Sequence, residues 1–165
     1  MDKKIAFLGT PNFAVPILKS IHQSNYKISC VFSQPPRKSN RGHKLNKSPI
    51  HLLSEQLGIE IKTPENIEKE IDYIKSLNLD LAIVVAYGQI LSKDILSLSK
   101  NGFINIHASL LPKWRGAAPI QRSLINMDKI TGLSIMKINS KLDEGPVCNK
   151  SVSYTHLRAH ETVSD

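Results

Sequence analysis

Leu79-Asp80-Leu81-Ala82-Ile83-Val84-Val85-Ala86 is the strongest strand signal in the sequence, with one polar residue among eight. A continuous apolar run of this length is typical of a parallel strand that is buried on both faces of a sheet. Two shorter apolar runs precede it, at residues 4–9 and 28–32. Because Gly9 ends the first run, the chain can turn sharply there toward the next element. The sequence therefore predicts a sheet with a buried centre.

Segments with helical spacing of apolar residues separate these strands. Phe13, Ile17 and Ile21 recur at that spacing after the first strand. Further helices are predicted at residues 50–57, 66–77, 93–98 and 117–126, and further strands at 59–61, 103–107 and 131–138. Because strands and helices alternate, we expect an α/β fold with a doubly wound, mostly parallel sheet covered by helices on both faces.

Length and composition exclude several classes of protein. The 165 residues suit one domain, and 41% hydrophobic with 22% charged residues is a globular profile. No apolar run approaches the roughly 20 residues that a membrane span needs, so we expect a cytoplasmic protein without membrane association. The two cysteines, Cys30 and Cys148, form neither a disulfide framework nor a zinc pattern. The turn at residues 9–13 lacks two glycines of the dinucleotide fingerprint, which argues against a dehydrogenase.

The positive charge is concentrated near the start of the chain. The formal net charge is +8, yet residues 3–54 contain no Asp or Glu and carry nine Lys and Arg. Five of the nine fall between Pro35 and Pro49. A focused basic patch fits a polyanion such as nucleic acid, whereas a solvated surface loop explains it equally well.

Asn105 and His107 are the first candidate catalytic pair. They stand two residues apart at the end of a predicted strand, so both side chains point to the same side. Ligands of open α/β sheets bind beyond the carboxyl ends of the strands. An amide donor can stabilise the oxyanion of acyl transfer, and an imidazole can manage the proton of an amine. A lone histidine is more often structural, so this pair alone is a weak signal.

Asp143 is the third candidate, in a turn after the strand predicted at 131–138. A carboxylate beside a histidine fixes its tautomer and stabilises its protonated form. An aspartate that merely forms the turn explains the residue as well. We predict that Asn105, His107 and Asp143 converge at the carboxyl end of the sheet.

A longer pattern surrounds the candidate pair. Residues 105–123, Asn-Ile-His-Ala-Ser-Leu-Leu-Pro-Lys-Trp-Arg-Gly-Ala-Ala-Pro-Ile-Gln-Arg-Ser, closely resemble the signature of the folate-dependent formyltransferases, in particular those that act on methionyl-tRNA. Residues 9–14 and 84–91 agree with this resemblance, and residues 34–45 resemble the insertion that faces tRNA in that family. The resemblance extends from about Lys4 to Lys150.

The resemblance implies a Rossmann-like formyltransferase fold, a reaction and its residues. Asn105, His107 and Asp143 match the catalytic residues, and the formyl group of 10-formyltetrahydrofolate passes to the methionine of initiator methionyl-tRNA without a metal. The residues that match the folate site are Tyr87, Gly88, Gln89, Ile90, Leu91, Ser109, Leu110, Leu111 and Pro112. Arg41 matches a residue that meets the acceptor end of the tRNA, and the predicted tRNA-binding set is Arg37, Lys38, Arg41, Lys44 and Lys47.

Two departures from the family limit what the resemblance implies. The catalytic domain of the family continues past residue 165 into a second, β-barrel domain, and residues 151–165 do not resemble it. We therefore expect residues 1–150 to be an incomplete catalytic domain, residues 151–165 to be a tail of non-native origin, and the chain to be a monomer with weak activity or none. The alternatives are a formyltransferase for glycinamide ribonucleotide or a nucleotide sugar, and a non-catalytic RNA-binding fragment.

Overall fold

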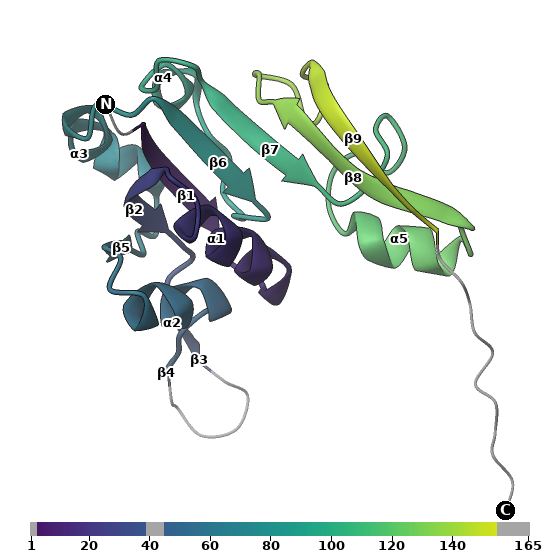
Figure 1. The fold of residues 1–165 in the computed structure, drawn as a ribbon, viewed down its shortest axis with the longest axis horizontal. Helices are drawn as coiled ribbons and strands as arrows, with labels where there is room; N and C mark the ends of the chain where they lie inside the picture. Colours follow the sequence, from purple (N-terminus) through teal and green to yellow (C-terminus); the bar gives the residue numbers. More distant parts are fainter. Residues whose placement is uncertain (1–2, 39–44, 155–165) are drawn as a thin grey trace, which may run out of the picture.

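A computed structural model describes residues 3–38 and 45–154 of the chain. Its main feature is a seven-stranded sheet in the order β5-β2-β1-β6-β7-β8-β9, which Figure 1 shows running from left to right. The strands of this sheet are β1 (Lys4–Gly9), β2 (Lys27–Phe32), β5 (Ile61–Lys62), β6 (Leu81–Val85), β7 (Phe103–His107), β8 (Ile130–Lys137) and β9 (Val147–Tyr154). Two short strands, β3 (Arg37–Lys38) and β4 (Leu45–Asn46), form a separate antiparallel pair.

Five strands of the sheet run parallel to one another: β5, β2, β1, β6 and β7. β8 is antiparallel to β7, and β9 is antiparallel to β8. The order reverses beside β1, which leads to β2 on one side and pairs with β6 on the other. The prediction of an α/β fold with a mostly parallel, doubly wound sheet is confirmed.

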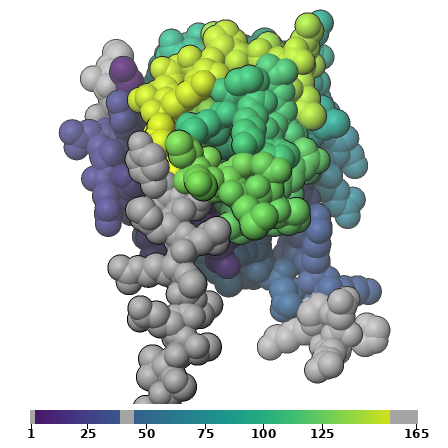
Figure 2. Space-filling view, turned by 90° about the vertical axis from the view of Figure 1, so that its right-hand side faces the viewer, coloured from purple at the N-terminus to yellow at the C-terminus, as the bar shows by residue number. Residues whose placement is uncertain are grey.

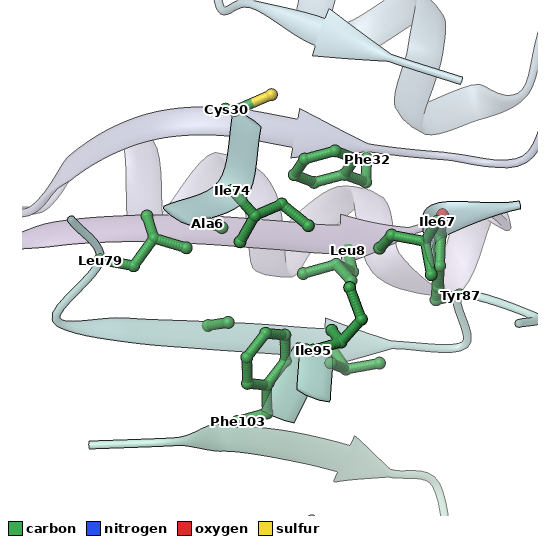
Figure 3. Close-up of a cluster of buried hydrophobic side chains, with 12 residues drawn as sticks. Ala6, Leu8, Cys30, Phe32, Ile67, Ile74, Leu79, Tyr87, Ile95 and Phe103 are labelled. Atoms are coloured by element: carbon green, nitrogen blue, oxygen red, sulfur yellow. The ribbon is translucent and has the colours of Figure 1, made fainter. Parts of the chain in front are cut away.

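Helices cover both faces of the parallel strands, and the helical segments are η1 (Asn12–Ala14), α1 (Val15–His22), α2 (Pro49–Gln56), η2 (Ile67–Glu70), α3 (Ile71–Ser76), α4 (Lys93–Leu96) and α5 (Pro119–Ile125). Leu18 of α1 and Ile50 of α2 pack on one face of the sheet. Ile74 of α3 and Ile95 of α4 pack on the other, against Phe103 and the residues drawn in Figure 3. These two cores hold the parallel strands as a rigid frame.

Most elements lie within one or two residues of their predicted bounds, and three differences have an identifiable cause or consequence. The predicted helix 66–77 begins as the 3-10 turn η2, where the Asn66 side chain accepts a hydrogen bond from the amide of Glu68, and continues as α3. α5 begins at Pro119 rather than residue 117, because Ala118 adopts a left-handed conformation with φ 56°. β9 continues through the predicted domain boundary at Lys150 to Tyr154 and pairs with β8 over this length. Residues 155–165 lie outside the described residues.

Candidate active site

β7 places two of the three predicted catalytic residues on one face of the sheet. Side chains alternate along a strand, so Phe103, Asn105 and His107 share a face, whereas Ile104 and Ile106 pack into the core under α1 and α2. Phe103 belongs to the opposite core, together with α3 and α4. The last residues of β7 therefore carry their polar side chains on the α4 side of the sheet.

Asp143 reaches this pair from an unexpected direction. Because β8 is antiparallel to β7, its last residues lie beside the start of β7, with the Ile138 amide donating to the Phe103 carbonyl. The following turn folds back over β7, and the amide nitrogen Nδ2 of Asn105 donates to Oδ1 of Asp143 at 3.3 Å. Nδ1 of His107 lies 3.7 Å from Oδ2 of Asp143. The structure thus brings the three residues together, although Asp143 does not follow the carboxyl end of a parallel strand.

The loop between β7 and α5 closes the site with backbone groups. The amide of Gly116 donates to Oδ2 of Asp143 at 2.8 Å, and the carbonyl of Trp114 lies 2.8 Å from Nε2 of His107. Both neighbours of the imidazole are thus acceptors, and a neutral ring can donate to only one of them. With the proton on Nε2 the ring donates to the Trp114 carbonyl, and Nδ1 then faces the Asp143 carboxylate across 3.7 Å. Sequence reasoning missed these two backbone contacts because a backbone group can come from any residue type.

The side chains of His107 and Asp143 are largely shielded from water, and Asn105 is half-buried. The side chains of His107 and Asp143 are 7% and 12% exposed. Nδ2 of Asn105 carries two hydrogens, and its bond to Asp143 uses one of them. The arrangement combines a free amide hydrogen, an imidazole and a carboxylate, which are groups suited to stabilising an oxyanion and moving a proton.

A second feature lies where the strand order reverses, at the carboxyl ends of β1, β2 and β6. A cavity of about 320 Å³ opens there, with Thr10, Gln34, Arg37 and Asn46 among its lining residues. The Thr10 hydroxyl and the Gln34 side-chain amide both donate to the carbonyl of Tyr87, at 2.9 and 3.2 Å. Such a position in a doubly wound sheet is the usual place for a ligand.

The family assignment follows from comparison with known proteins. A family model described as "Formyl transferase" matches residues 3–165. The chain belongs to the formyl transferase family. The methionyl-tRNA formyltransferase of Pelagibacter ubique (strain HTCC1062) is 62% identical over 90% of this chain and 49% of its own length. That of Phenylobacterium zucineum (strain HLK1) is 45% identical over 98% of this chain and 52% of its own length. The chain therefore spans about half the length of these curated relatives.

Solved structures of formyl transferases share the fold. The phosphoribosylglycinamide formyltransferase from Bacillus Halodurans superposes with a TM-score of 0.76 at 16% identity, over 95% of this chain and 82% of its own. A formyltetrahydrofolate deformylase from Pseudomonas syringae pv. tomato gives a TM-score of 0.75 at 19% identity, over 96% of this chain and 53% of its own. At these identities the likeness establishes the Rossmann-like fold alone.

The first group of predicted folate residues in this formyl transferase chain, residues 109–112, organises the loop after β7. The Ser109 hydroxyl donates to the Lys113 carbonyl at 2.5 Å. The Leu111 amide donates to the Ser134 hydroxyl at 3.0 Å, and that hydroxyl donates to the Ser109 carbonyl at 2.7 Å. Ser109 and Leu111 are buried, Leu110 is half-buried and Pro112 is exposed. Their contact with folate stays a prediction.

The second group, residues 87–91, follows β6, the neighbour of β7 in the sheet. Tyr87 is buried in the core, whereas Gly88 is exposed in a left-handed conformation with φ 89°. The Gln89 side chain accepts from the Ile67 amide and donates to the Pro64 carbonyl, which anchors the segment. The side chain of Ile90 is 94% exposed. Leu91 packs against the core. The assignment of residues 87–91 to the folate site stays a prediction.

Of the predicted tRNA-binding residues that the structure describes, Arg37 lies at the cavity. Arg37 and Lys38 form β3 and are exposed, and Arg37 lines the cavity. Lys47 is paired with Glu55 at 2.5 Å, and this contact lowers the pKa of Glu55. Part of the predicted positive charge is therefore balanced within the protein. Arg41 and Lys44 lie outside the described residues.

Within residues 3–38 and 45–154, no group of three or more His, Cys, Asp and Glu is arranged to hold a metal ion. Over the same ranges, no helix has the length and hydropathy required to cross a membrane.

Proposed function

We propose that this chain carries the chemistry of methionyl-tRNA formyltransferase, transferring the formyl group of 10-formyltetrahydrofolate to the amino group of methionine on initiator tRNA. The observation that carries the proposal is the convergence of Asn105, His107 and Asp143 in a member of the formyl transferase family. Relatives named for this activity that are up to 62% identical support the same choice of acceptor.

The reaction needs one bond to form and one to break. The neutral amino nitrogen of methionine attacks the formyl carbon, and the carbonyl electrons move to oxygen to give a tetrahedral oxyanion. The attacking nitrogen then loses a proton and N10 of the folate gains one. When the oxyanion collapses, the bond between carbon and N10 breaks and leaves a formamide and tetrahydrofolate.

The three side chains supply what these steps require. One N–H of the Asn105 side-chain amide donates to the oxyanion, while the other keeps its hydrogen bond to Asp143. Nδ1 of His107, the ring nitrogen that Trp114 does not hold, relays the proton between the two nitrogens, and Asp143 beside it stabilises the protonated ring. Because the site is largely shielded from water, these charges interact more strongly than they would in solution.

The basic segment supplies the contact with tRNA in this proposal. Arg37, beside the cavity, and Arg41, outside the described residues, neutralise phosphates of the acceptor end. Each such contact releases counterions, so tRNA binding weakens as the salt concentration rises. Arg41→Ala is expected to weaken the use of tRNA and to leave folate binding intact.

The proposal is tested with the chain in excess over initiator methionyl-tRNA and 10-formyltetrahydrofolate, by following formyl-methionyl-tRNA. We expect His107→Gln to lower the rate by about 10²- to 10⁴-fold, as removal of a proton-transfer group does. A matched variant, His51→Gln, changes a histidine on α2, away from β7, and is expected to keep the rate. Measurable formyl transfer by the chain that stays unchanged in His107→Gln would contradict the catalytic assignment.

The same assay separates the acceptors. Glycinamide ribonucleotide and an amino sugar nucleotide replace the tRNA as acceptors, at the same donor concentration. Formylation of one of these in preference to methionyl-tRNA would overturn the proposed acceptor and keep the reaction type. Binding of tRNA without formyl transfer to any acceptor would instead indicate a non-catalytic RNA-binding role.

A further inference from the structure

Asp128 lies in the turn after α5, and its side chain is only 6% exposed. Its carboxylate accepts hydrogen bonds from three side chains. Nζ of Lys113 and Nδ2 of Asn126 each donate to Oδ1 at 2.6 Å. Nε1 of Trp114 donates to Oδ2, also at 2.6 Å. Two of these donors belong to the loop after β7, and the third lies at the end of α5. Asp128 therefore ties the loop to the helix end.

The loop residue that Asp128 holds is also the residue that contacts His107. The indole of Trp114 bonds to Asp128, while the carbonyl of the same residue lies 2.8 Å from Nε2 of His107. Trp114 has a left-handed backbone with φ 58°, a conformation that is unfavourable for a bulky residue. Surrounding contacts must hold such a conformation, and on the indole side they include the hydrogen bond to Asp128.

We propose that Asp128 is a positioning residue for the formyl-transfer site, because it fixes the Trp114 carbonyl that holds Nε2 of His107. The inference rests on the proposed function for the role of His107, but the geometry does not depend on which acceptor is used. With Nε2 held by Trp114 and Nδ1 facing Asp143, the orientation of the imidazole ring is set from both ends.

The charge of Asp128 matters as well as its shape. An asparagine side chain has nearly the same size, but one carboxylate oxygen becomes an amide nitrogen that cannot accept from a donor. It also loses the negative charge that faces Lys113, whose ammonium lies 5.3 Å from the Trp114 ring centre. Asp128→Asn is therefore expected to release the indole and, through it, the Trp114 carbonyl.

The test uses two signals of the chain itself, without folate or tRNA. Trp114 is the sole tryptophan, so the indole N–H gives one NMR resonance. The Nε2–H of His107, assigned by its loss in His107→Gln, is expected to be visible because a carbonyl holds it and water is excluded. We expect Asp128→Asn to shift the indole resonance upfield and to remove the His107 Nε2–H resonance by exchange with water.

Asp80→Asn is the matched control, because Asp80 also pairs with a lysine, Lys100 at 2.9 Å, but does so beside the start of β6. It is expected to leave both resonances in place. Trp114→Phe keeps an aromatic side chain and removes the indole N–H that donates to Asp128. It should therefore also release the carbonyl of residue 114 and remove the His107 signal. This second variant tests the proposal even if Asp128→Asn does not fold. A His107 Nε2–H signal unchanged in Trp114→Phe, or absent from the unaltered chain, would overturn the proposal. Failure of formyl transfer alone leaves these signals unaffected, so it would count against the proposed function instead.

Discussion

The five parallel strands and the β8–β9 hairpin with α5 are packed in different ways. The parallel strands lie between two apolar cores, with side chains such as Phe7 and Phe32 buried completely. The described residues include twelve large hydrophobic side chains that are exposed, and eight of them lie between residues 120 and 152, in and around α5 and the hairpin. In Figure 2, α5 and the hairpin, green to yellow, form much of the surface that faces the viewer.

In the hairpin region, hydrogen bonds and ion pairs take the place of apolar packing. A cavity of about 220 Å³ lies beside α5, with Phe13, Ile120 and Leu133 among its lining residues. Yet this region carries Asp143 and Asp128, whose carboxylates bind the loop and the catalytic side chains. Apolar burial of β7 therefore places Asn105 and His107, whereas hydrogen bonds and close backbone contacts place their partners.

The largest expected effect is on the parallel half. Phe7→Ala removes a completely buried ring and should lower the free energy of unfolding by about 3–5 kcal/mol. Val152→Ala, in the hairpin at 53% exposure, should change it by less than about 0.5 kcal/mol. Urea unfolding of both variants provides the measurement. Similar losses in the two variants would remove the contrast between the regions.

A smaller effect is expected at the turn that carries Asp143. A Cβ atom at Gly145 would lie 1.7 Å from the Lys137 carbonyl oxygen, so Gly145→Ala must push the turn away from β8. We expect a loss of roughly 1–3 kcal/mol in the free energy of unfolding, as for overpacked sites.

The matched control for the turn is Gly58→Ala, where a Cβ meets no atom within 4 Å and the cost arises from the φ of +66°. That variant should lose only about 1 kcal/mol. A smaller loss for Gly145→Ala than for Gly58→Ala would show that the backbone approach in the hairpin is not tight.

A still smaller effect concerns the acid dependence of stability. The hydrogen bond from Lys113 is the main cause that holds the pKa of the Asp128 carboxyl well below its usual range, and the hydrogen bonds from Trp114 and Asn126 add to it. The resulting stabilisation is present above the pKa of an unfolded aspartate, about 3.9, and is lost as the pH falls below it toward the folded value. Unfolding followed from pH 6 downward should therefore show a shallower acid decline for Asp128→Asn than for the unaltered chain. Superimposable declines would mean that the carboxylate is not stabilised by its donors.

The last expected outcome involves no change in stability. Cys30 is buried in β2 and burial raises its pKa to about 11, whereas Cys148 is exposed in β9. A maleimide at pH 8 should label Cys148 in the folded chain and Cys30 only after unfolding, because the thiolate is the reactive form. Mass spectrometry of peptides identifies the labelled residue. Labelling of Cys30 in the folded chain would show that the parallel core opens as readily as the hairpin.

Local sequence patterns were enough to predict most of the parallel strands. The bounds of β1 and β7 agree with the predicted runs 4–9 and 103–107, because a strand buried on both faces or alternating in polarity is visible in the sequence itself. The α5 boundary was less predictable, because the left-handed conformation of Ala118 depends on the loop before it. The direction of β8 could not be predicted either, because strand periodicity is the same for parallel and antiparallel pairing.

Alternation of apolar and polar residues, together with residue chemistry, was enough to predict the α/β class, the common face of Asn105 and His107, and Asp143 as a candidate, because these are local properties. The antiparallel direction of β8, which sends Asp143 back over β7, is visible only in the folded chain, as are the backbone contacts of Trp114 and Gly116 that complete the site. The hydrogen bond by which Asp128 holds this loop is likewise a tertiary contact. The contact between Asn105 and Asp143 joins residues 38 positions apart in the chain, and local patterns of side chains do not encode such pairings.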